Sequence, residues 1–150
     1  MRTRNSFLVL LLPVTLLVAV VTPARAADPV QLKRDGDKVE VTVQGRPFTT
    51  FYFGAEAPKP YLHPLRTASG KVVTRGYPMI KDDAEEIRTK YQDHPHHRGL
   101  FYAHGDVNGA DFWAEGPKKG RIVFKSLDEV KSGRRGTLAA TFEWKTAEGK

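Results

Sequence analysis

Short stretches of the chain alternate apolar and polar residues with a period of two. The clearest is 38–43, with the sequence Lys-Val-Glu-Val-Thr-Val, in which successive side chains would point to opposite faces of a strand. The segment 44–47 contains glycine and proline and predicts a turn. The β-branched and aromatic residues of 48–53 then predict a second strand that pairs with the first.

The same kind of pattern recurs later in the chain. Further strand-like stretches are 61–66, 71–74 beyond a turn at 69–70, and the antiparallel pair 121–125 and 137–144, joined by a turn near 132–133. Only 82–91 has a helical composition, and because it is short and polar an exposed loop fits it equally well. Several strands with glycine and proline turns predict an all-β fold, an antiparallel sandwich or barrel, and we expect a sandwich. The strand-like pattern still continues at 142–146, so we expect an incomplete sandwich, part of a longer β-domain.

The N-terminal part has a different pattern. A basic start and an apolar run over 7–21 precede a small-x-small motif at 24–26. This arrangement predicts a secretory signal peptide over 1–26, whose removal leaves one domain over 27–150 in the periplasm or outside the cell. An uncleaved membrane anchor is the alternative, but the apolar run is shorter than the ~20 residues of a spanning helix. We therefore expect no stable membrane insertion after the signal is removed.

Charge and cysteine content narrow the function classes further. The net charge of +7 would fall to +4 with loss of the three arginines of the predicted signal, and the remaining basic residues are scattered among acids. Nucleic-acid binding is not expected from that pattern. The chain has no cysteine, so disulfides and thiolate zinc sites are excluded.

The candidate chemistry is concentrated in one run of histidines. Four of the five histidines lie within eleven residues: His94, His96, His97 and His104. Imidazole is the commonest protein metal ligand and a general acid or base near neutral pH. The run therefore predicts a functional site, with acid–base chemistry and polar contacts to a substrate as one role and metal coordination as another. A hydrogen-bonded structural cluster is the third reading.

The proline in this run predicts its local geometry. Pro95 disfavours a helical conformation at His94, so we expect an extended segment in which His94 and His96 share a side and His97 faces the other way. A divalent metal could then be held by His94 and His96. The third ligand would be His104, with His63, Asp93 or Asp106 as alternatives.

The residues beside the histidines add possible substrate contacts. Arg98 is predicted either to clamp a carboxylate or hydroxyls of a polar substrate or to form an ion pair with Asp93. Trp113 could provide a flat platform for a sugar ring, although aromatic residues of this kind also occur in cores.

Three Asx residues close to the run predict turns. Asp106, Asn108 and Asp111 have a spacing similar to that of a calcium loop, but the glycine and glutamate positions of an EF-hand do not fit. An Asx-rich turn is the preferred interpretation.

Taken together, these motifs resemble the bacterial PmoA-like family. The resemblance covers roughly 38–145 and is carried by 60–67, 69–76, 93–100, 103–109 and 111–113. It implies an exported protein of about twice this length, of which this chain is the N-terminal half, with a sandwich similar to those of galactose mutarotases, in which histidines and carboxylates act on sugars. The family often carries the label "methane oxygenase", but beyond residue 26 the chain has no apolar run approaching the ~20 residues that an integral membrane subunit needs.

The sequence thus supports three hypotheses of function. The first is a protein that binds or acts on a carbohydrate, with hydrolase, lyase or epimerase chemistry, and a sugar-like molecule or glycan as its partner. Its predicted catalytic residues are His94, His96, His97 and His104, and its predicted substrate-binding residues are Arg98, His63, Trp113 and Asp106. The alternatives are a histidine-ligated metalloprotein or oxidase and a non-catalytic periplasmic interaction module.

Overall fold

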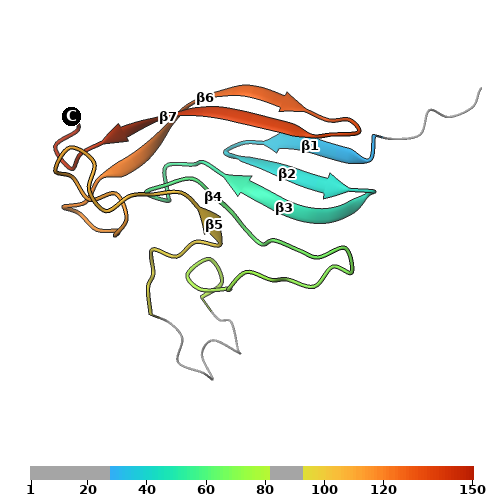
Figure 1. Ribbon diagram of the computed structural model, residues 1–150, viewed down its shortest axis with the longest axis horizontal. Coiled ribbons are helices and arrows are strands. Elements are labelled where there is room, and N and C mark those ends of the chain that lie inside the picture. The colour runs from blue at the N-terminus through green and yellow to red at the C-terminus, as the bar shows by residue number, and fades with distance from the viewer. Residues whose placement is uncertain (1–27, 82–92) are drawn as a thin grey trace, which may run out of the picture.

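A computed structural model describes residues 28–81 and 93–150, and over these residues the chain is all-β (Figure 1). The predicted fold class, an antiparallel β-sandwich, is confirmed by two antiparallel sheets of five and two strands. The predicted signal peptide and the segment 82–91, which fits a helix or an exposed loop equally well by its sequence, lie outside the described residues. Within the described ranges there is no helix that could cross a membrane.

The larger sheet is an antiparallel meander in which consecutive strands are neighbours. Its strands are β1 (Val30–Asp35), β2 (Lys38–Val43), β3 (Arg46–Tyr52), β4 (Tyr61–Leu62) and β5 (Leu100–Phe101). The hairpin predicted from the alternating residues is β2–β3. Sequence patterns did not identify β1 or β5, because β1 has only two apolar residues and β5 is only two residues long, too short for a period to be visible.

The second sheet is the predicted C-terminal hairpin. It consists of β6 (Arg121–Lys131) and β7 (Thr137–Lys145), with two irregularities in the register along β6. The turn between β6 and β7 is tied to β1, since Gly133 pairs with Val30 and the Ser132 hydroxyl accepts a hydrogen bond from the backbone N of Leu32 at 2.9 Å. Figure 1 accordingly shows the hairpin lying along the β1 side of the larger sheet.

Aromatic side chains hold the two sheets face to face. Phe53, which directly follows β3, contacts Phe124 of β6 with ring centroids 4.4 Å apart, and Phe51 meets Phe142 of β7 at 6.2 Å. Phe51 and Phe53 point to the same side of the strand because they are two residues apart. Among the described residues, the buried apolar side chains belong to Val39, Phe53, Phe112 and Ile122, of which Val39 is fully buried.

The inter-sheet layer is not closed beside β5. An apolar groove of about 520 Å³ opens there. It is lined by Phe51, Pro60, Tyr61, Leu62, Leu100, Phe101, Tyr102, Ile122, Phe142 and Trp144.

The opposite face of the larger sheet carries a row of side chains in register across all five strands. Asp35 pairs with Lys38, Lys38 with Tyr52, Tyr52 with Tyr61, and Tyr61 with Phe101. Directly paired residues of an antiparallel sheet share a face. This cross-strand row (Asp35, Lys38, Tyr52, Tyr61, Phe101) therefore forms a polar and aromatic surface that ends at β5, next to the histidine run.

The packing predicts unequal effects for two phenylalanines near the same strand. Phe53 is 4% exposed, whereas Phe48 is 39% exposed. We expect Phe53→Ala to lower the free energy of unfolding by about 3 to 5 kcal/mol, because it leaves a cavity between the sheets, and Phe48→Ala to lower it by less than about 1 kcal/mol. Urea unfolding followed by circular dichroism measures both. Equal losses for the two variants would contradict the inter-sheet core described here.

Candidate functional site

The histidine run begins with a turn rather than with an extended segment. The backbone N of His97 donates to the carbonyl of His94 at 2.9 Å, and His94 has a φ of 51°. Pro95 thus occupies the second position of a β-turn, where its fixed φ is favourable. The predicted extended geometry is wrong, because the hydrogen bond that closes the turn outweighs the preference of the residue before proline.

The turn brings three imidazole rings together. The ring centroids of His96 and His97 are 4.5 Å apart, those of His94 and His97 are 4.9 Å apart and stacked, and those of His94 and His96 are 5.6 Å apart. The expectation that His97 faces away from His94 and His96 is therefore wrong. A turn gathers side chains that a strand would separate.

Trp113 reaches these rings from the loop that connects β5 to β6. Its neighbour Phe112 is buried and packs against Trp144 of β7, with ring centroids 4.8 Å apart. Trp113 points away from this anchor and is 42% exposed. Its ring lies 5.9 Å from that of His96, 5.8 Å from that of His97 and 5.5 Å from that of Phe101. We refer to His94, His96, His97, Phe101 and Trp113 as the His–Trp cluster.

A network of charged side chains, Arg98, Glu115 and Lys59, packs against the cluster and supports it. Arg98 forms a two-pronged ion pair with Glu115, with N–O distances of 2.8 and 2.9 Å. Lys59, whose side chain is 1% exposed, lies 3.7 Å from the same carboxylate, and its ammonium donates to the backbone carbonyl of Trp113. The ammonium also lies 5.0 Å from the ring centre of Phe101. This network fixes Trp113 relative to the histidine run.

Two alternatives were predicted for Arg98, a contact with substrate and an ion pair with Asp93. The ion pair with Asp93 does not form, because Arg98 faces Glu115 and Asp93 contacts His94 at 2.8 Å and Arg75 at 3.7 Å. The hydrogen bond from His94 holds the pKa of the Asp93 carboxyl below its usual value.

The surroundings of His96 and His97 favour the neutral form of these two imidazoles. Partial burial lowers the pKa of His96, and the neighbouring His97 and Lys59 lower it further. Burial also lowers the pKa of His97, together with the nearby charges of His94 and Arg75. The Nε2 atom of His96 is buried and has no hydrogen-bond partner among the described residues. A neutral imidazole keeps one N–H donor and one acceptor nitrogen, so the site can both donate and accept.

Three predicted site residues are not part of the cluster's ring contacts. His104 directs Nδ1 to the backbone of Asp106, and the Asp106 carboxylate accepts from the backbone N of Gly109 at 2.8 Å. His63 is 5% exposed and lies against Gly99. Glycine is required at position 99, because a Cβ there would come within 2.5 Å of the Leu62 carbonyl oxygen. The structure thus gives these residues local roles in shaping the chain around the cluster.

The Asx turns predicted from the sequence are confirmed. Besides the turn at Asp106, the Asp111 carboxylate accepts from the backbone N of Trp113 at 2.8 Å and of Ala114 at 3.1 Å, and it pairs with Lys119 at 2.8 Å. This carboxylate therefore orients the start of the turn that presents Trp113.

The predicted metal ligands are only partly brought together. His94 and His96 are adjacent, but His104 faces its own loop. Over residues 28–81 and 93–150, no group of three or more histidine, aspartate or glutamate side chains is placed to hold a metal ion. Metal binding through His94, His96 and His104 stays a prediction from the sequence.

Sequence reasoning missed the residues that support the cluster. Lys59 lies 54 residues before Trp113, and Glu115 lies 17 residues after Arg98. Neither has a local signature, except that Lys59 stands between two prolines. Only the fold brings these charges together, so no pattern of spacing could have identified them.

The shared carboxylate predicts a large effect for Glu115→Ala. The substitution leaves Lys59 buried without its nearest countercharge and removes both prongs of the Arg98 pair. We expect the free energy of unfolding to fall by about 3 kcal/mol or more. Glu143→Ala is the matched control, since Glu143 pairs with Lys125 and Lys145 at the surface and its loss is expected to cost less than about 1 kcal/mol. Comparable losses in urea unfolding would contradict the role of the buried network.

The Asp111 turn predicts an acid-dependent loss of stability. Hydrogen bonds from Lys119 and from the backbone of Ala114 and Trp113 lower the pKa of Asp111 from 3.8 to about 2. Because the folded pKa is below the unfolded value, the stabilisation is complete above about pH 5 and is lost as the pH falls towards the folded pKa. The difference in the free energy of unfolding between wild type and Asp111→Asn should shrink over that range. Urea unfolding at a series of pH values tests this, and a constant difference would refute it.

Comparisons with known proteins give a family but no activity. Neither the curated proteins nor the solved structures compared with this chain gave a match. A family model described as "Family of unknown function (DUF6807)" matches residues 38–150, a range that includes the His–Trp cluster and its charged support. That description names no ligand, and the resemblance to the PmoA-like family stays a prediction. Because the match spans most of the sequence, the chain belongs to the DUF6807 family of unknown function.

Proposed function

We propose that this protein binds a carbohydrate at the His–Trp cluster. The observation that carries the proposal is the exposed ring of Trp113 standing edge-on to the imidazoles of His96 and His97. A sugar ring has an apolar C–H face and a rim of hydroxyl groups. An exposed aromatic face beside a few fixed polar groups matches both parts of such a ligand.

The polar side of the site suits hydroxyl groups better than charged groups. A hydroxyl both donates and accepts, as does a neutral imidazole. The Nε2 of His96 is a buried polar atom with no hydrogen-bond partner among the described residues, so a turn of the ring that lets a ligand hydroxyl satisfy it would be favourable. His97, beside it, offers a second neutral ring. Arg98 contributes by positioning, because its guanidinium is engaged by Glu115.

A reaction on the bound sugar is the second candidate function. It is favoured by the proximity of His96 and His97, whose ring centroids are 4.5 Å apart. Two neutral imidazoles on one side of a substrate can move protons to and from it. Hydrolase, lyase and epimerase chemistry all use such transfers, and binding is the step that they share. We propose further that the protein acts outside the cytoplasm, as the N-terminal pattern of the chain implies.

The binding proposal predicts a specific ranking of variants. A glycan array identifies the strongest ligand, and isothermal titration calorimetry then measures its affinity for each variant. Trp113→Ala and His96→Ala should each weaken binding by at least about tenfold, equal to about 1.4 kcal/mol. His104→Ala is the comparison variant, because this ring is exposed and bonded to its own loop, and its affinity should stay within about twofold of wild type.

Two results would contradict the proposal. One is the absence of any array ligand for a wild-type protein whose thermal unfolding is cooperative. The other is a ligand whose affinity is unchanged in Trp113→Ala and His96→Ala. Adding the strongest ligand and following products by chromatography separates an enzyme from a binding protein.

A further inference from the structure

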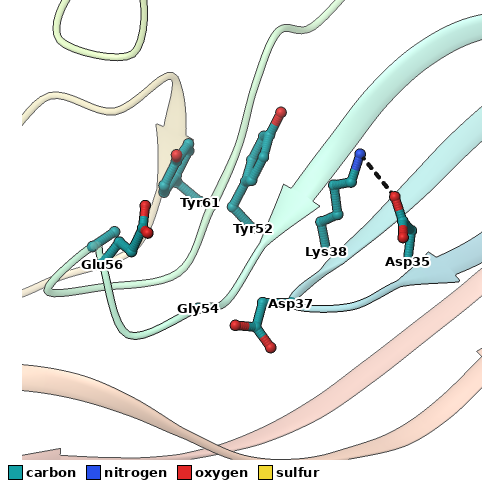
Figure 2. Close-up of a pocket in the computed structure, with 8 residues that line it drawn as sticks. Asp35, Asp37, Lys38, Tyr52, Gly54, Glu56 and Tyr61 are labelled. Atoms are coloured by element: carbon teal, nitrogen blue, oxygen red, sulfur yellow. Dashed lines mark ion pairs between the residues drawn. The ribbon is translucent and has the colours of Figure 1, made fainter.

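A second concave surface lies at the other end of the cross-strand row. This pocket has a volume of about 360 Å³ and is lined by Asp35, Asp37, Lys38, Tyr52, Gly54, Glu56, Ala57 and Tyr61 (Figure 2). Four of these residues also belong to the cross-strand row: Asp35, Lys38, Tyr52 and Tyr61. Asp35, on β1, is the end of that row. The sequence patterns did not indicate a site here.

The floor of the pocket is aromatic. The rings of Tyr52 and Tyr61 are stacked, with centroids 5.0 Å apart and planes inclined by 18°. Both tyrosines lie on the face of the larger sheet that carries the cross-strand row, and Tyr61 also lines the apolar groove beside β5. Figure 2 shows the two rings side by side with the Glu56 carboxylate close to Tyr61. A pair of partly exposed tyrosines on a strand face is a surface on which flat ligands can pack.

The rim of the pocket consists mostly of hydrogen-bond acceptors. Lys38 is engaged with Asp35 at 3.1 Å and with Glu40 at 2.8 Å. The carboxylates of Asp37 and Glu56 belong to exposed residues. Carboxylate oxygens accept hydrogen bonds from hydroxyl groups, and their charge disfavours an acidic ligand.

The pocket and the His–Trp cluster are parts of one surface. Tyr61 lines the pocket, and the guanidinium of Arg98 lies over its ring at 5.7 Å from the centroid. Phe101, the next residue in the row, contacts both His97 and Trp113. Since neighbouring strands are about 4.8 Å apart, Tyr52 and Phe101 are separated by about 10 Å, which is more than a single sugar ring covers.

We propose that this pocket is a second sugar subsite and that the ligand is a neutral oligosaccharide rather than a monosaccharide. The inference rests on the proposed carbohydrate binding at the His–Trp cluster. One sugar unit packs at Trp113, and the chain runs along the cross-strand row so that a later unit packs against the ring of Tyr52, which Tyr61 supports by stacking. The hydroxyl groups of that unit donate to Glu56. An acidic chain is disfavoured because the pocket is also lined by the carboxylates of Asp35 and Asp37.

The test is the dependence of affinity on chain length. Cello-, xylo-, manno- and galacto-oligosaccharides, from monosaccharide to hexasaccharide, are titrated into the full chain by calorimetry, with oligogalacturonates as the acidic comparison. Wild type should bind one neutral series with an affinity that rises by at least about tenfold with length. Tyr52→Ala and Glu56→Gln should abolish that rise and leave the monosaccharide affinity unchanged. Glu129→Gln, at an exposed position of β6, is the matched control and should bind as wild type.

The outcomes separate this inference from the function on which it rests. The second subsite is overturned if affinity does not depend on oligosaccharide length. It is also overturned if affinity rises with length in Tyr52→Ala and Glu56→Gln as much as in wild type. Both results leave binding at Trp113 standing. A preference for the oligogalacturonates overturns the neutral ligand. Loss of binding to every series in Trp113→Ala alone, with Tyr52→Ala and Glu56→Gln unchanged, also overturns the subsite. Absence of binding to all series by wild type overturns both proposals. Glu56→Gln changes one exposed side chain, so its melting temperature should equal that of wild type. An unchanged melting temperature shows that a change in its affinity does not come from misfolding.

Discussion

The sharing of one carboxylate by two cations is the interaction on which the site depends. Glu115 faces both Arg98 and Lys59, so it joins three segments that are far apart in the sequence: the histidine run, the segment before β4 and the loop before β6. A buried ammonium is tolerated only where its charge is compensated and its hydrogen bonds are made. Lys59 meets this condition through Glu115 and the carbonyl of Trp113. The position of the exposed tryptophan is thus a consequence of satisfying a buried charge.

The second constraint is that the two faces of the larger sheet have different roles: one packs against the hairpin β6–β7, and the other carries the cross-strand row. Phe51 and Phe53 point towards the hairpin β6–β7, whereas Tyr52 points the other way. Alternation along the strand therefore separates residues that stabilise the sandwich from residues that are available to a ligand. The alternation continues on the edge strand β5, with Leu100 paired to Leu62 and Phe101 paired to Tyr61, although Leu100 is 52% exposed at this edge. Both proposed subsites lie on the face that the core does not use.

The polar groups differ between the two ends of this face: imidazoles lie at one end and carboxylates at the other. At one end, burial and neighbouring charges lower the pKa of His96 and His97, and the imidazoles are neutral hydrogen-bonding groups. At the other end, Asp37 and Glu56 line the same pocket as a stacked pair of tyrosines. The two ends share aromatic surfaces bordered by polar atoms. That combination is the basis of the proposed binding of a ligand with many hydroxyl groups, and it joins the histidine run to residues that no sequence pattern had connected to it.

The amino-acid sequence by itself determined the local features of this protein. Alternation over 38–43 and 48–53 predicted the β2–β3 hairpin, and the density of histidines between 94 and 104 indicated where a candidate site lies. These features are local because strand periodicity and turn chemistry act over a few residues. The Asx turns at Asp106 and Asp111 were predictable for the same reason.

Only the tertiary structure decided how the site is assembled. The hydrogen bond from His97 to His94 turned an expected strand into a turn and brought three rings together. The pairing of Arg98 with Glu115, and of Lys59 with the Trp113 carbonyl, joins residues 17 and 54 positions apart. The cross-strand row likewise exists only once the register of five strands is set. Such contacts depend on which segments the folded chain brings side by side, and no short-range pattern in the sequence encodes that.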